Sequence, residues 1–87
     1  MSKPTLYVKQ GCPWCVDAVA YFNAKGIDLK IIDVRAEPKR MNELLEVSGQ
    51  SMTPTFKAGD FVVSDFDIEE FEVALKKNPE AKINLKL

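Results

Sequence analysis

The hydrophobic pattern of the first third of the chain predicts a strand, a helix and a second strand, in that order. Residues 5–9 (TLYVK) form a short run of β-prone side chains. Between Pro13 and Lys25, just before Gly26, apolar residues return at helical spacing, and a proline suits the first turn of a helix. Residues 29–34 (LKIIDV) are rich in β-branched side chains, and we expect a strand buried on both faces near its centre.

The middle of the chain predicts a second helix and then a β-hairpin. The helix opens at Pro38 and keeps its apolar residues roughly on one face until Gly49 ends it. Two short β-prone runs follow at residues 55–58 and 61–64. Because a turn-forming Gly-Asp pair separates them, we expect an antiparallel hairpin.

The last part of the chain predicts a third helix. Asp67 and Glu70 have the spacing of a capping box, and we expect Asn78 and Pro79 to end the helix. Residues 80–87 alternate only weakly, which leaves a frayed tail and a small added strand both open. The complete order is βαβαββα, which is typical of an α/β protein.

The composition fits one small globular domain spanning residues 1–87. The sequence is 46% hydrophobic, and twelve basic and thirteen acidic side chains leave a formal net charge of -1. This balance gives no reason to expect nucleic acid or an anionic membrane as a partner. No apolar stretch has the length of a signal peptide or a membrane span. We therefore expect a cytoplasmic protein, and we expect it to be a monomer.

The chain contains two cysteines, Cys12 and Cys15, and no histidine. Two cysteines at this spacing cannot build a disulfide framework, and closing so short a loop would remove little entropy from the unfolded chain. The lack of histidine excludes Ser-His and Cys-His catalysis and histidine metal ligands. Chemistry in this protein must therefore rest mainly on thiols.

The position of the cysteine pair points to thiol–disulfide exchange. Cys12 precedes the first turn of the predicted helix, where free N–H groups and the helix dipole stabilise an anion, and Lys9 adds a nearby positive charge. We predict Cys12 as the nucleophile and Cys15, one turn later and more shielded, as the resolving thiol. Trp14 between them either covers apolar surface or offers a flat face to a substrate.

Two other interpretations of the cysteine pair remain open. Cys12 and Cys15 can be small hydrophobic residues that lie close together without a chemical role. They can also form half of a four-cysteine zinc or iron–sulfur site shared between two chains, since one pair supplies only two of four ligands. In that case the thiols would be ligands and not nucleophiles.

Pro54 is the next feature, because a proline at the start of a strand after a helix is often tied to a special backbone geometry. Spacing alone favours an ordinary trans bond after Thr53, since only about 5–6% of X-Pro bonds in folded proteins are cis. The residues by themselves therefore do not predict a cis bond.

Three stretches of the chain resemble the glutaredoxin family. Residues 7–15 (YVKQGCPWC) are similar to its strand–loop–CPYC pattern, residues 48–54 (SGQSMTP) to the stretch that ends in Thr-Val-Pro, and residues 59–67 (GDFVVSDFD) to its final hairpin. The resemblance implies a thioredoxin-like α/β fold, with a four-stranded mixed sheet flanked by three helices. It also implies a cis bond between Thr53 and Pro54, with Pro54 facing the cysteines.

By the same resemblance, glutathione is the reducing co-substrate. The backbone of Thr53 would pair with its γ-glutamyl-cysteinyl part, Lys9 would meet its glycine carboxylate, and Asp65 would hold its γ-glutamyl end. The predicted glutathione and substrate site is completed by Trp14, Gln50 and Pro54. The residues alone also allow a solvated charge at Lys9, a turn residue at Asp65 and a loop amide at Gln50.

The third stretch departs from the glutaredoxin pattern. The Gly-Gly pair of the family is Val62-Val63 here, and its Cys-Asp-Asp is Ser-Asp-Phe at residues 64–66, which keeps one carboxylate. The stretch from Pro54 to Phe66 is also similar to the redoxins that serve ribonucleotide reductase and take electrons from thioredoxin reductase. The Cys-Pro-Trp-Cys centre is more like a glutaredoxin than like the Cys-x-Gln-Cys of those redoxins.

The leading hypothesis is a small dithiol oxidoreductase that reduces protein disulfides and glutathione mixed disulfides, with no bound cofactor or metal. One alternative is a redoxin reduced by thioredoxin reductase, for example an electron donor to ribonucleotide reductase. Another is a metal- or cluster-binding dimer, and a third is a non-enzymatic interaction module.

Overall fold

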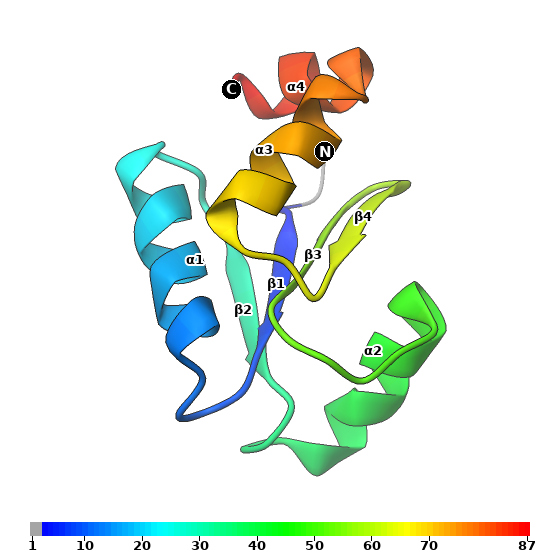
Figure 1. The fold of residues 1–87 in the computed structure, drawn as a ribbon. Helices are drawn as coiled ribbons and strands as arrows, with labels where there is room; N and C mark the ends of the chain where they lie inside the picture. The colour runs from blue at the N-terminus through cyan, green and yellow to red at the C-terminus, as the bar shows by residue number, and fades with distance from the viewer. Residues whose placement is uncertain (1–2) are drawn as a thin grey trace.

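The computed structural model describes residues 3–87 as a four-stranded mixed sheet with helices on both faces (Figure 1). The strands are β1 (Thr5–Val8), β2 (Lys30–Asp33), β3 (Thr55–Ala58) and β4 (Phe61–Ser64). They lie in the order β2–β1–β3–β4, with β1 parallel to β2 and antiparallel to β3, and with β4 antiparallel to β3. The predicted mixed sheet is confirmed, and residues 1–2 of the predicted domain lie outside the described part.

Four α-helices lie within residues 3–87, one more than predicted. They are α1 (Pro13–Ala24), α2 (Met41–Ser48), α3 (Ile68–Lys76) and α4 (Pro79–Leu85). The predicted opening at Pro38 is a single 3-10 turn, η1 (Pro38–Arg40), which leads into α2. None of the helices in this part of the chain has the length and apolar character needed to cross a membrane.

The end of the chain is a helix, not the tail or strand considered from the sequence. Asn78 and Pro79 follow α3, as expected, but they also begin α4. The Asn78 side chain accepts the N–H of Ala81 at 3.1 Å, and Pro79 occupies the first turn. Ala81 is buried in the core. A short helix that is marginal alone is thus held by its cap and by packing.

The prediction of double burial for the second strand was wrong. Ile32 of β2 is buried, but its neighbour Ile31 is 49% exposed, and successive residues of a strand point to opposite faces. The reason is position, because β2 is an edge strand of the sheet. The β-branched run therefore reflects strand propensity and one-sided burial.

An aromatic cluster fills the face of the sheet that carries α1, α3 and α4. Phe22 of α1 stacks on Phe56 of β3 at 4.8 Å between ring centroids, and Phe71 of α3 meets both rings edge-on at 5.0 and 5.1 Å. All three side chains are fully buried. Stacked and edge-on arrangements suit the ring quadrupoles and add to the gain from apolar burial.

The opposite face of the sheet carries a smaller core beneath α2. Tyr7, Ile32, Val34 and Leu44 form this cluster. The buried Tyr7 donates its hydroxyl hydrogen bond to Glu43 of α2 at 2.9 Å, and Arg40 binds the other carboxylate oxygen of Glu43 at 2.7 Å. Polar contacts therefore help to hold α2 on this face.

Candidate active site

Cys12 lies in the connection between β1 and α1. The chain leaves β1 through Gln10 and Gly11, and Gly11 adopts a φ of 83°, a left-handed conformation that glycine takes at little cost. The N–H of Cys12 then donates to the carbonyl oxygen of Lys9 at 3.2 Å, which closes the turn. Cys12 is thereby the N-cap residue of α1.

The sulfur of Cys12 takes the place of a capping oxygen. It accepts the N–H of Cys15 at 3.2 Å, while Pro13 fills a first-turn position whose N–H would have no helical partner. Free N–H groups at a helix start stabilise negative charge, so this position suits a sulfur that attacks or leaves as a thiolate. The predicted location at a helix start is confirmed, and the predicted nucleophilic role stays a prediction.

Cys15 points into the core. It follows the buried side of α1 that also carries Ala18 and Phe22, and it is only 3% exposed. Burial raises the pKa of the Cys15 thiol above its ordinary value of 9.0, and the hydrogen bond with Cys12 raises it further. Cys15 is therefore a protonated thiol near neutral pH and lies behind the more accessible Cys12, and its predicted role as the resolving thiol stays a prediction.

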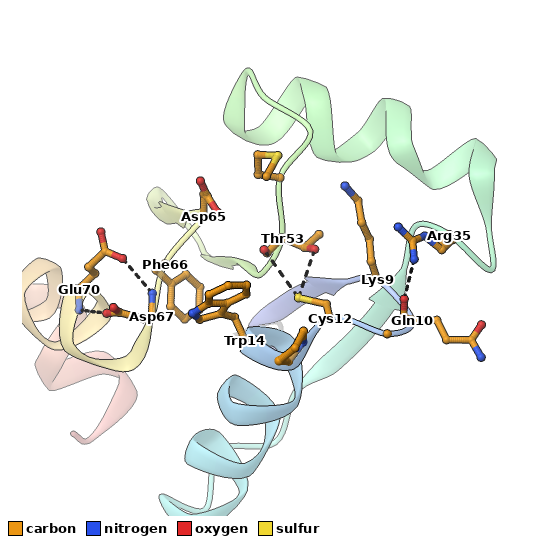
Figure 2. A pocket seen from close by; sticks show the side chains of 13 residues that line it. Lys9, Gln10, Cys12, Trp14, Arg35, Thr53, Asp65, Phe66, Asp67 and Glu70 are labelled. Atoms are coloured by element: carbon orange, nitrogen blue, oxygen red, sulfur yellow. Dashed lines mark hydrogen bonds between the residues drawn. The ribbon is translucent and has the colours of Figure 1, made fainter.

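The loop before β3 brings Thr53 against the Cys12 sulfur. The Cys12 thiol lies 3.9 Å from the Thr53 carbonyl oxygen, and the Thr53 hydroxyl lies 3.9 Å from the same sulfur (Figure 2). The bond between Thr53 and Pro54 is cis, as the family resemblance implied. Pro54 itself is fully buried, so Thr53 is the member of the pair that meets the cleft.

Gln50 lies outside the cleft, although it was predicted as a glutathione contact. Its side-chain NH₂ donates to the hydroxyls of Ser48 at 2.6 Å and Thr55 at 3.2 Å, and its side-chain oxygen accepts the N–H of Met52 at 2.6 Å. These bonds fold the loop that delivers Thr53 to the sulfur. Gln50 is thus placed to shape the loop, one of the two interpretations left open from the residues.

An open cleft of about 580 Å³ surrounds Cys12. Its walls come from the β1–α1 connection, the residue after Val34, the loop before β3 and the segment between β4 and α3. Trp14 stands at the cleft with 60% of its surface exposed, which leaves a large apolar face free for a substrate. The predicted residues that line the cleft are Lys9, Cys12, Trp14, Thr53 and Asp65.

The cleft has opposite charges on its two sides. Figure 2 shows Lys9 and Arg35 on one side of Cys12 and Asp65 on the other. Asp67 and Glu70, on the side of Asp65, are occupied by a capping box, in which each accepts the other's backbone N–H at 2.8 and 3.1 Å. The charges divide the cleft into a basic side and an acidic side, with the sulfur between them.

Arg35 is one of the cleft residues that the sequence analysis did not predict. It stands just beyond β2, and its guanidinium donates to the carbonyl oxygen of Gln10 at 2.8 Å. A signal was present, because β1 and β2 pair in parallel and parallel strands end at one edge of the sheet. Residues just after β2 therefore had to lie near the connection that carries Cys12.

The stretch that departs from the glutaredoxin pattern forms β4 and the far wall of the cleft. Val62 and Val63 are half-buried in the strand, and Phe66 is buried at the cleft edge. Asp65 has a φ of 51°, and its N–H donates to the carbonyl oxygen of Pro54 at 2.9 Å. The backbone of Asp65, the residue that carries the one retained carboxylate, is thus bonded directly to the cis-proline loop.

No group of three or more histidine, cysteine or acidic side chains within residues 3–87 is arranged to hold a metal ion. Cys12 and Cys15 are both free thiols in this structure. The hypothesis of a shared zinc or cluster site would need further ligands from a second chain, and it stays a prediction.

The fold, with the partly buried Cys12 at the cleft and the buried Cys15 one turn further along α1, defines a thiol redox protein with the thioredoxin-like fold. Comparison with known families agrees, because the model of the glutaredoxin family matches residues 5–63. That match spans more than half of the chain, so this chain belongs to the glutaredoxin family. Membership suggests thiol–disulfide oxidoreductase activity, with Cys12 and Cys15 as the redox-active pair.

Solved structures of similar shape include proteins of more than one redox type. A glutaredoxin from Brucella melitensis is 29% identical, over 99% of this chain and 90% of that one, with a TM-score of 0.68. The thioredoxin-like protein BC3987 is 27% identical over 84% and 100% of the two chains, with a TM-score of 0.74.

A third similar structure is the glutaredoxin-like NrdH-redoxin from Escherichia coli, described as having a thioredoxin-like activity profile. It is 25% identical over 83% of this chain and 95% of that one, with a TM-score of 0.66. No match was found among curated protein sequences. The similar structures thus include both a glutaredoxin and a glutaredoxin-like redoxin.

Proposed function

We propose that this protein is a dithiol oxidoreductase that reduces protein disulfides and glutathione mixed disulfides. The observation that carries the proposal is the Cys12 sulfur, which caps α1 at the cleft while Cys15 lies buried behind it. The Cys12 sulfur accepts the N–H of Cys15 at 3.2 Å, at a helix start where an attacking sulfur meets free N–H groups. The raised pKa of Cys15 keeps the second thiol protonated until it is needed.

The reaction with a protein disulfide has two exchange steps. The Cys12 thiolate attacks one sulfur of the substrate, the substrate disulfide breaks, and the other sulfur leaves and takes up a proton. Cys15 then loses its proton and attacks Cys12, which releases the second substrate thiol. Substrate gains two electrons and two protons, and the enzyme is left with a Cys12–Cys15 disulfide.

A glutathione mixed disulfide needs only Cys12. The thiolate takes the glutathionyl group, the substrate thiol leaves, and free glutathione then attacks the enzyme–glutathione disulfide to give oxidised glutathione. The cleft supports this route, with Thr53 beside the sulfur, Lys9 on the basic side for a glycine carboxylate, and Asp65 on the acidic side for an amino group.

Substitution of each cysteine separates the two routes. Reduction of a glutathionylated peptide and of a protein disulfide is measured for Cys15→Ser and for Cys12→Ser, with unfolding curves to show that both variants fold. We expect Cys12→Ser to lose both activities, and Cys15→Ser to lose only protein disulfide reduction. Loss of the glutathionyl activity in Cys15→Ser as complete as in Cys12→Ser would contradict the one-thiol route.

The second candidate is a redoxin that takes its electrons from thioredoxin reductase. Val62 and Val63 stand where the glutaredoxin pattern has Gly-Gly, and only Asp65 remains of its paired carboxylates. Similarity to an NrdH-redoxin described as having a thioredoxin-like activity profile supports the same candidate.

The two candidates differ in which reductant restores the dithiol. The oxidised protein is offered NADPH with thioredoxin reductase, or NADPH with glutathione and glutathione reductase, and NADPH consumption is followed. Turnover with glutathione supports the first candidate. Rapid turnover with thioredoxin reductase and none with glutathione would replace it with the second.

A further inference from the structure

Arg35 holds a fixed position at the basic side of the cleft. One N–H of its guanidinium donates to the Gln10 carbonyl oxygen at 2.8 Å. Its own backbone N–H and that of Ala36 donate to the Asp33 carboxylate at 2.8 and 3.0 Å, which fixes the turn after β2. The side chain is thereby anchored at both ends.

The anchored guanidinium has donors left for a ligand. Arginine carries five N–H donors in one plane, and a carbonyl oxygen engages one of them. Within residues 3–87, no carboxylate lies within ion-pair distance of the Arg35 guanidinium or of Lys9. Both side chains line the cleft on the same side of Cys12 (Figure 2). Asp33 is the carboxylate that interacts with Arg35 electrostatically, but it is occupied by the backbone N–H groups of Arg35 and Ala36. Two cations with no carboxylate at ion-pair distance therefore line the cleft where a substrate would bind.

We propose that Arg35 is a specificity-determining residue that binds a carboxylate on one side of the substrate disulfide. The proposal rests on the proposed thiol–disulfide exchange at Cys12. A planar guanidinium matches a carboxylate with two parallel hydrogen bonds, and its attachment to Gln10 lowers the ordering cost of binding. Disulfides with a carboxylate at that position react faster than neutral or cationic ones.

The test compares three small symmetrical disulfides that differ in charge. They are dithiodiglycolate, which is anionic, 2-hydroxyethyl disulfide, which is neutral, and cystamine, which is cationic. Reduced protein is mixed with each, and the second-order rate of its oxidation is followed by the fluorescence of Trp14. Each reaction turns the protein dithiol into a disulfide and the small disulfide into two thiols, so no reductase is needed.

Arg35→Gln is expected to slow the anionic disulfide by about three- to fivefold, as for an exposed charge pair. The neutral disulfide is expected to change by less than about twofold, because charge steering acts only on charged partners. Arg35→Lys keeps the charge but cannot make two parallel hydrogen bonds to a carboxylate. Its rate with the anionic disulfide is expected to lie between those of wild type and Arg35→Gln. Lys82→Gln, an exposed charge on α4, is the matched control and should leave all three rates unchanged.

A purely structural role for Arg35 predicts a different result. If the residue served only to hold the Gln10 carbonyl, Arg35→Gln would slow all three disulfides by the same factor, and that outcome would overturn the proposal. The wild-type protein gives an independent check, since its preference for the anionic disulfide must fade at about 1 M salt. A wild-type protein that fails to react with the neutral disulfide would instead contradict the proposed function itself.

Discussion

The two faces of the sheet support the active site in different ways. On one face, the buried rings of Phe22, Phe56 and Phe71 pack against each other, and Cys15 lies in the same core. On the other face, α2 rests on a smaller cluster and is tied by the hydrogen bond between Tyr7 and Glu43.

The two cysteine sulfurs and the loop beside them are therefore held in place by different parts of the molecule. The cysteine pair belongs to α1, whose inner side is part of the aromatic core. The loop that carries Thr53 leaves α2 and is folded by the amide of Gln50. We call the face that carries α1, α3 and α4 the aromatic face, and the face beneath α2 the polar face. We expect the free energy of unfolding to depend mainly on the aromatic face. We expect the reactivity of Cys12 and the change of stability with pH to depend more on the polar face.

Removal of one ring from the aromatic face has the largest expected effect. Phe71→Ala should lower the free energy of unfolding by about 3–5 kcal/mol, because it removes a fully buried ring and leaves a cavity. Urea unfolding measures the loss. Val73→Ala, on the exposed side of the same helix, is the control and should cost less than about 1 kcal/mol. Similar losses for the two variants would remove the proposed role of the aromatic face.

Tyr7→Phe tests the polar face with almost no change in shape. It leaves Glu43 paired with Arg40 and should cost about 1 kcal/mol of unfolding free energy, the net value of one hydrogen bond. Tyr21→Phe, which removes an exposed hydroxyl bonded to Glu72 at 3.3 Å, is the control and should cost less.

The same variant changes stability in alkali. Burial, together with the hydrogen bond and charge of Glu43, raises the pKa of Tyr7 from 10.0 to about 12. A group with a raised folded pKa contributes stability that is fully present below pH 10 and is lost as the pH rises toward 12. Wild type should therefore lose more stability over this window than Tyr7→Phe, and parallel curves would show that Tyr7 does not titrate in this way.

Gln50→Ala is expected to change reactivity more than stability. The free energy of unfolding should fall by about 1 kcal/mol. The rate of exchange at Cys12 should fall severalfold, because Thr53 is no longer held against the sulfur. Stopped-flow oxidation and urea unfolding are compared on one preparation, with Asn84→Ala as an exposed amide control. An unchanged rate would show that Gln50 is not what holds Thr53 against the Cys12 sulfur.

The smallest expected effect is a loss of stability in acid that comes from the titration of Glu43. The hydrogen bond and charge of Arg40, with the hydrogen bond from Tyr7, hold the pKa of Glu43 below its ordinary value of 4.5. A lowered folded pKa contributes stability above pH 4.5 that is lost as the pH falls through the folded pKa. The pair is partly exposed, so this contribution is below about 1 kcal/mol. Glu43→Gln should show a flatter curve of stability against pH.

Local signals in the sequence predicted most of the elements correctly. The capping box of Asp67 and Glu70 starts α3, and Cys12 and Pro13 stand at the start of α1, as predicted. Such features depend on neighbours in the chain, so a sequence displays them. The cis bond before Pro54 came only from the family resemblance, because residue spacing carries no information on that isomer.

The errors arose where a feature depends on distant contacts. Ile31 belongs to a strong β-prone run, but only the strand order shows that β2 lies at an edge. Pro79 marks both the end of one helix and the start of the next, and packing of Ala81 decides between them. Arg35 carries no motif, and it reaches the cleft through the parallel pairing of β1 and β2.

The placement of α4 has a practical consequence. Its residues pack near the start of β1 and the β3–β4 turn, at the opposite end of the sheet from the β1–α1 connection (Figure 1). A fluorescent reporter or a surface linker joined at α4 would therefore sit far from the sulfur and leave the cleft open to large partners. The domain is suited to attachment through α4, as a probe or an immobilised reagent.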